Sequence, residues 1–68
     1  MPFANLKVPA GTLSAEQKEI LITKVTSLYA ETFGPEVIPS TMVLIDEVVD
    51  GGWGMAGEVL TLAKLQQG

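Results

Sequence analysis

The sequence contains no cysteine, no histidine and no arginine. Without cysteine the chain cannot form a disulfide, and without cysteine or histidine it lacks the side chains that hold most zinc ions. Without arginine it cannot capture a carboxylate through two parallel hydrogen bonds from one side chain. Its cations are four dispersed lysines, which eight acids outweigh to give a net charge of −4. The chain therefore has no basic patch for nucleic acid, and we expect neither a metal ion nor another cofactor.

Long apolar runs are also missing. No run in the sequence reaches the 18 residues that indicate a membrane-spanning helix, so we expect no membrane partner. The first residues lack the charged region and the apolar core of a secretory signal. Together with the absence of cysteine, this pattern predicts a cytoplasmic protein.

Apolar side chains are in excess for so short a chain, since they make up 47% of the 68 residues. A monomer of this length buries only about 60% of the surface that its unfolded chain exposes, and its stability is marginal. A subunit interface extends the core and stabilises the folded state. We therefore expect one domain, residues 1–68, that assembles into an oligomer.

A strand is predicted close to the start of the chain. Residues 3–8 alternate in character, with Ala4, Leu6 and Val8 on one face. Pro9 ends this strand because proline has no N–H to donate to a ladder.

A long helix and a second strand follow. Ser14 and Gln17 have the spacing of a capping box, and apolar residues three and four positions apart predict a helix over residues 15–33 that ends at Gly34. Residues 40–49 have a continuously apolar centre, which is typical of a strand covered on both faces. Strand, helix and strand in this order predict a right-handed β-α-β unit with parallel strands.

The C-terminal part is rich in glycine. Its glycines match neither phosphate-binding pattern, so they indicate turns and not a nucleotide site. Residues 53–55 and 58–59 predict a small hairpin turned at residues 56–57, followed by a short helix over residues 61–65. A lone apolar hairpin is unstable in water, so we expect this one to pack on a neighbouring subunit.

Two pairs of residues within these elements call for separate predictions. Tyr29 and Phe33 belong to the apolar stripe of the helix, so we expect them in the core and not in a site. Asp46 and Glu47 are adjacent on a strand and therefore face opposite ways, so they cannot form a carboxylate pair.

Pro2 is the candidate catalytic residue. Met1 is normally removed when a small residue follows it, and its removal would leave Pro2 with a free secondary amine. That amine is a compact base, and its pKa follows the rules of burial and nearby charge that govern other titrating groups. A proline after the initiator is nevertheless common and usually has no function, so the rest of the chain must support the assignment.

Five features, taken in this order and at this length, resemble the tautomerase superfamily, and most closely the small 4-oxalocrotonate tautomerase type. They are Met1-Pro2 before a strand, the turn at Gly11, the helix start at residues 14–18, the strand end at residues 45–47 and the segment of residues 52–58. The resemblance covers nearly the whole chain, with about one extra residue near Leu13. It implies an α+β fold, in which a β-α-β subunit with parallel strands and a C-terminal β-hairpin pairs into a four-stranded sheet and assembles as a hexamer.

The resemblance also implies an isomerase. Pro2 would be the general base or acid that moves a proton on a small keto/enol or unsaturated acid. In the hydrating and dehalogenating branches, the prolinium acts instead as an acid beside an activated water. Trp53 would line the pocket of a neighbouring subunit.

The chain departs from the family pattern where dicarboxylate-processing members use two arginines. These positions are occupied by Thr12 and Met42, which we expect to contact substrate without supplying charge. Lys7 is the candidate for a replacement cation, although a lysine at a strand edge is usually solvated. Pro9 removes a backbone amide that the family places just after the first strand. We therefore expect poor turnover of dicarboxylates by a homo-oligomer.

Three interpretations remain open from the sequence. The first is a Pro2-dependent enzyme with a pocket more apolar than that of the dicarboxylate enzymes. The second is one subunit of a hetero-oligomer, whose partner supplies the arginines. The third is an oligomeric module that has lost catalysis.

Overall fold

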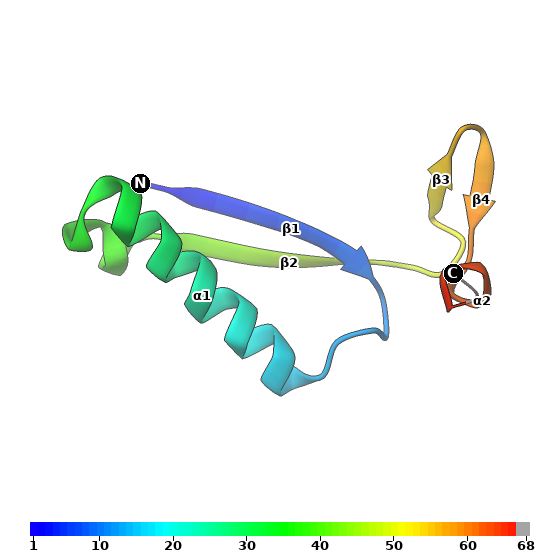
Figure 1. The fold of residues 1–68 in the computed structure, drawn as a ribbon, viewed down its shortest axis with the longest axis horizontal. Helices are drawn as coiled ribbons and strands as arrows, with labels where there is room; N and C mark the ends of the chain where they lie inside the picture. Colours follow the sequence, from blue (N-terminus) through cyan, green and yellow to red (C-terminus); the bar gives the residue numbers. More distant parts are fainter. Residues whose placement is uncertain (67–68) are drawn as a thin grey trace.

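The computed structural model describes residues 1–66, and the fold is a β-α-β unit followed by a hairpin and a short helix (Figure 1). In chain order the elements are β1 (Phe3–Pro9), α1 (Ala15–Phe33), the 3₁₀ helix η1 (Pro35–Ser40), β2 (Met42–Val48), β3 (Trp53–Met55), β4 (Glu58–Leu60) and α2 (Leu62–Gln66). The predicted fold class and the predicted order of elements are confirmed. Within residues 1–66, no helix combines the length and the apolar character that crossing a membrane requires.

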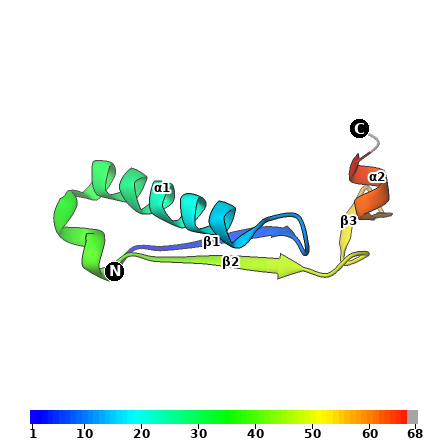
Figure 2. The same ribbon diagram turned by 90° about the horizontal axis from the view of Figure 1, so that it is seen from below.

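Strands β1 and β2 are parallel, in a register that runs from Phe3 opposite Met42 to Pro9 opposite Val48. Helix α1 covers one face of this two-stranded sheet (Figure 2). Strand β1 extends one residue beyond the predicted end, through Pro9. Pro9 can belong to the strand although it has no N–H, because the last N–H that donates to β2 is that of the next residue. This residue is Ala10, whose N–H donates to the Val48 carbonyl at 2.8 Å.

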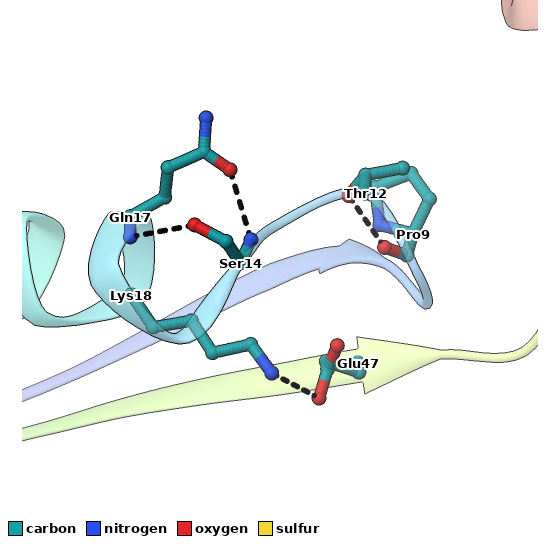
Figure 3. A network of polar contacts seen from close by, with 6 residues as sticks. All are labelled: Pro9, Thr12, Ser14, Gln17, Lys18 and Glu47. Atoms are coloured by element: carbon teal, nitrogen blue, oxygen red, sulfur yellow. Dashed lines mark hydrogen bonds and ion pairs between the residues drawn. The ribbon is translucent and has the colours of Figure 1, made fainter.

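Helix α1 begins and ends where the sequence predicts. The Ser14 hydroxyl accepts from the Gln17 N–H at 3.1 Å, and the Gln17 side chain accepts from the Ser14 N–H at 2.9 Å (Figure 3). This reciprocal pair is the capping box, which satisfies two N–H groups that the first turn leaves free. At the other end Gly34 has a φ of 101°, which glycine adopts without steric cost, and its N–H donates to the Ala30 carbonyl at 2.8 Å.

The core of the single chain is thin. Among the side chains that the structure describes, Ala4 is the one buried hydrophobic residue, at 8% exposure. On the face of the sheet that lies away from α1, Phe3, Met42 and Leu44 are each about half exposed. The prediction that β2 is covered on both faces is therefore wrong for a single chain, because α1 supplies one cover and nothing in the same chain supplies the other among the described residues.

The chain also exposes more surface than a compact monomer. Its accessible surface is 4975 Å², against about 4,100 Å² expected for a monomer of its 7.2 kDa mass. Its radius of gyration is 14.8 Å, where about 11 Å is typical of a compact chain of this length. The shape is that of an open chain with an incomplete core.

The hairpin of β3 and β4 projects at the end of the molecule opposite the N-terminus (Figures 1 and 2). Its turn residues, Ala56 and Gly57, have positive φ values of 55° and 80°. Two positive values are what a two-residue turn of type I′ requires. An Asp50 side-chain oxygen accepts from the Leu62 N–H at 2.8 Å and thereby ties the start of α2 to the loop before β3. The predicted hairpin is confirmed.

Candidate active site

Pro2 lies beside a hollow of about 480 Å³ at the end of the molecule where β1 begins and α1 ends, which we call the N-terminal hollow. The residues that line it are Met1, Pro2, Phe3, Tyr29, Phe33 and Val37. The first residue, Met1, is 82% exposed, so its removal would uncover the Pro2 nitrogen without breaking a packed core. The position suits a catalytic amine that meets a small molecule.

The lining of the N-terminal hollow is mainly aromatic and aliphatic. The described side chains that line it include none that carries a charge, and the hydroxyl of Tyr29 is their one polar side-chain group. This hydroxyl donates to the Phe3 carbonyl at 3.5 Å, the outer limit of hydrogen bonding. The rings of Tyr29 and Phe33 meet edge to face, with centroids 6.1 Å apart.

Both aromatic residues were expected in the core. Tyr29 is half-buried and Phe33 is 57% exposed, so the core prediction is wrong for Phe33 in the single chain. Spacing along a helix could not separate the two outcomes, because residues that line a pocket and residues that fill a core follow the same period. Their position at the last turns of α1, beside the start of β1, was the available signal.

Of the predicted substrate-binding residues, Met42 is the one that lies next to Pro2. Its N–H donates to the Pro2 carbonyl at 3.0 Å, and it stands opposite Phe3 in the parallel register. Its side chain is 51% exposed and so can reach a ligand or another subunit.

Thr12 lies at the other end of the sheet. Its hydroxyl donates to the Pro9 carbonyl at 2.6 Å, which fixes it beside the last residue of β1 (Figure 3). Seven residue steps separate Pro2 from Pro9, and at the rise of a β-strand they span about 23 Å. Thr12 and Pro2 of one chain therefore cannot contact the same small ligand.

Trp53 also lies beyond this far end, on β3, and is not among the residues that line the N-terminal hollow. Its indole nitrogen is covered from solvent yet has no hydrogen-bond partner within residues 1–66. Leaving such a donor unpaired costs about 1–3 kcal/mol. The single chain thus leaves this donor without the partner that a buried N–H normally has.

Lys7 is engaged within the sheet. Its ammonium group lies 2.6 Å from a carboxylate oxygen of Asp46 on β2, and both side chains are about half exposed. The neighbouring Glu47 points to the other face, where it binds Lys18 of α1 at 3.0 Å (Figure 3). The prediction that Asp46 and Glu47 face opposite ways is confirmed.

A second hollow, of about 420 Å³, is lined by residues of α1 alone, which are Glu16, Glu19, Ile20, Thr23 and Lys24. It contains none of the residues that the sequence singles out. The N-terminal hollow is therefore the candidate active site.

Known proteins of one type resemble this chain in sequence and in structure. A family model described as tautomerase enzyme matches residues 2–63. A probable tautomerase K2 of Dickeya dadantii is 41% identical over 66 residues, which cover 97% of each chain. The crystal structure of DmpI from Helicobacter pylori is similar with a TM-score of 0.77 and 35% identity over 98% of each chain. A structure from a study of 4-oxalocrotonate tautomerase isozymes of Methylibium petroleiphilum is similar with a TM-score of 0.76 and 31% identity, covering 94% of this chain and 97% of that one.

Proposed function

We propose that this chain, which belongs to the tautomerase family, is an isomerase that uses the amine of Pro2, once Met1 is removed, to move a proton on a small keto/enol compound or unsaturated acid. The observation that carries the proposal is the place of Pro2, which directly precedes β1 and lines a hollow large enough for a small molecule.

The proposed reaction is a proton transfer within one molecule. The neutral Pro2 amine takes the proton from the enol hydroxyl, and the electron pair of that O–H bond forms the carbonyl as the double bond shifts. The resulting prolinium then gives its proton to carbon, which completes the ketone and restores the neutral amine. One group thus serves as base and then as acid, and the reaction consumes no other reactant.

We further propose that the complete site is formed between subunits. Pro2 and Met42 lie at one end of the sheet, whereas Thr12 and Trp53 belong to the other end, about 23 Å along the strand. Two chains that pair antiparallel would bring opposite ends together. The open shape of the chain and the unpartnered indole of Trp53 support this arrangement. A hexamer is the assembly that the resemblance to 4-oxalocrotonate tautomerases implies.

The substitution of Pro2 by alanine tests the proposal. The variant Pro2→Ala keeps an N-terminal amine but makes it primary and mobile, so we expect it to lose most activity on any enol that the wild type converts. Pro39→Ala is the matched control, because it removes an exposed proline from η1 and leaves the amine intact. Equal activity of Pro2→Ala and wild type, with the oligomer intact in both, would refute the role of Pro2.

A second candidate is a subunit of a hetero-oligomer, which the complete absence of arginine favours. In that case a related partner chain would supply the arginines that bind carboxylates, and this chain would supply the scaffold, Trp53 and Pro2. Expression of the chain alone distinguishes the two candidates. A lone chain that stays monomeric and inactive until a related chain is added supports the second, and an active homo-oligomer supports the first.

A further inference from the structure

We infer that the N-terminal hollow binds an uncharged aromatic group of the substrate and that the site gains nothing from a carboxylate on that substrate. The inference deepens the proposed function and rests on it, since it names the class of enol that Pro2 would meet.

The first argument for this inference is the size of the hollow and the aromatic residues that line it. With Met1 still among its walls, its volume of about 480 Å³ lies in the range of small-molecule sites, and removal of Met1 would open it further. Tyr29 and Phe33 already stand edge to face at 6.1 Å, a separation at which aromatic rings attract one another. A third ring that enters beside Tyr29 and Phe33 would meet apolar faces and edges, and it would displace water from them.

The second argument concerns charge. Each of the four lysines either contacts another group of the chain or lies away from the N-terminal hollow. Lys7 binds Asp46, Lys18 binds Glu47, and Lys64 donates to the Val59 carbonyl at 3.0 Å. The remaining lysine belongs to the second hollow, on another part of α1.

A carboxylate in the N-terminal hollow would therefore lose its hydration without gaining a counter-ion from these side chains, which is costly. The net charge of −4 adds a weak repulsion for anions. A second copy of the chain cannot supply an arginine, because the sequence has none. The site therefore favours a substrate that brings no charge into the hollow.

The hydroxyl of Tyr29 supplies the polar contact that remains. Its hydrogen bond to the Phe3 carbonyl, at 3.5 Å, is weak, so exchanging it for a ligand oxygen costs little. It is therefore the group in the hollow that can bind a neutral ketone or ester oxygen.

Three enols test the inference on the wild-type protein, without any variant. They are phenylenolpyruvate, its ethyl ester and 2-hydroxymuconate, which carry one, no and two carboxylates. We expect kcat/KM for the ester to equal or exceed that for the acid, and to exceed that for the dicarboxylate at least about tenfold, because an unpaired carboxylate pays for its desolvation. A preference for the acid over its own ester by a similar factor would overturn the inference.

A pair of lysine variants localises the effect. Phe33 in the hollow and Leu28 outside it lie on the same helix and are each 57% exposed, so a lysine at either position disturbs folding to a similar degree. We expect Phe33→Lys to reverse the preference of ester over acid, and Leu28→Lys to keep it. The inference fails if both variants, shown by light scattering and circular dichroism to be assembled and folded, give the wild-type ratio or shift it equally.

A binding measurement separates this inference from the proposed function. Phenylacetone, a neutral aryl ketone, should shift the ring resonances of Tyr29 and Phe33 in an NMR titration of the wild-type protein, and the dicarboxylate adipate should not. Such shifts in a protein whose Pro2→Ala variant is fully active would refute the role of Pro2 and leave the hollow as an aromatic pocket. Proline-dependent turnover without these shifts would refute the pocket and leave Pro2 as the base.

Discussion

Installing one arginine at Met42 should create activity on a dicarboxylate. Met42 lies next to Pro2, since its N–H donates to the Pro2 carbonyl at 3.0 Å. Its side chain is 51% exposed, so a longer side chain does not have to enter a packed core. The resemblance places an arginine of the dicarboxylate enzymes at this position. Met42→Arg therefore adds the missing cation at the strand position beside Pro2.

The expected gain follows from one hydrogen bond. A hydrogen bond to a charged group contributes about 1.5–3 kcal/mol. If the bond forms in the transition state, this range corresponds to an increase in kcat/KM of about 10- to 150-fold. A second arginine, at Thr12, is not needed for this gain, because Thr12 lies beside Pro9 at the other end of the sheet.

The assay follows the ultraviolet absorbance of 2-hydroxymuconate as it is converted to its ketone. Leu44→Arg is the matched control, because Leu44 lies on the same strand and face, is 45% exposed and stands about 7 Å further from Pro2. The gain should appear in Met42→Arg alone and should be absent for the ethyl ester of phenylenolpyruvate. An equal gain in both variants, or none in Met42→Arg, would refute the assignment of Met42 to the site.

Three further predictions concern assembly and stability. Light scattering at micromolar concentration should give the mass of an oligomer, with six subunits expected, and a monomer would contradict the inference from the exposed apolar surface. Ser14→Ala should lower the stability by about 1 kcal/mol in denaturant unfolding, because it removes the capping box, and an unchanged midpoint would show that the box is not formed. Ala56→Asn should raise the melting temperature, because asparagine tolerates the positive φ of this position. Gly57→Ala should lower the melting temperature through backbone strain alone, because an added Cβ at Gly57 meets no atom within 4 Å among the described residues. Equal melting temperatures for these two variants would refute the turn geometry.

Local signals allowed most of the fold to be predicted. The limits of α1 follow from Ser14 and Gly34, which act within a few residues of the helix ends. The hairpin follows from turn residues adjacent to its two short strands. In each case the residues that decide the structure are close in sequence, so their pattern is visible before folding.

The candidate site was less predictable because it depends on distant contacts. Lys7 is the cation that the sequence offered as a replacement for arginine, and it binds Asp46, which lies 39 residues later in the chain. The pairing register of β1 and β2 brings these two residues together. Phe33 was assigned to a core because it belongs to the apolar stripe of α1, and a residue that lines a hollow follows the same spacing. Within one chain, Trp53 lies at the end of the sheet away from Pro2, so the predicted role of Trp53 in the pocket of a neighbouring subunit stays a prediction.

The most direct test of the central claim is the intact mass of the native protein before and after reaction with bromopyruvate. We predict a mass that lacks Met1 and, after reaction, one adduct per subunit that peptide mapping places on Pro2, with activity lost in proportion. Native protein that retains Met1, or an adduct elsewhere with Pro2 unmodified, would contradict the claim that the Pro2 amine is the catalytic group.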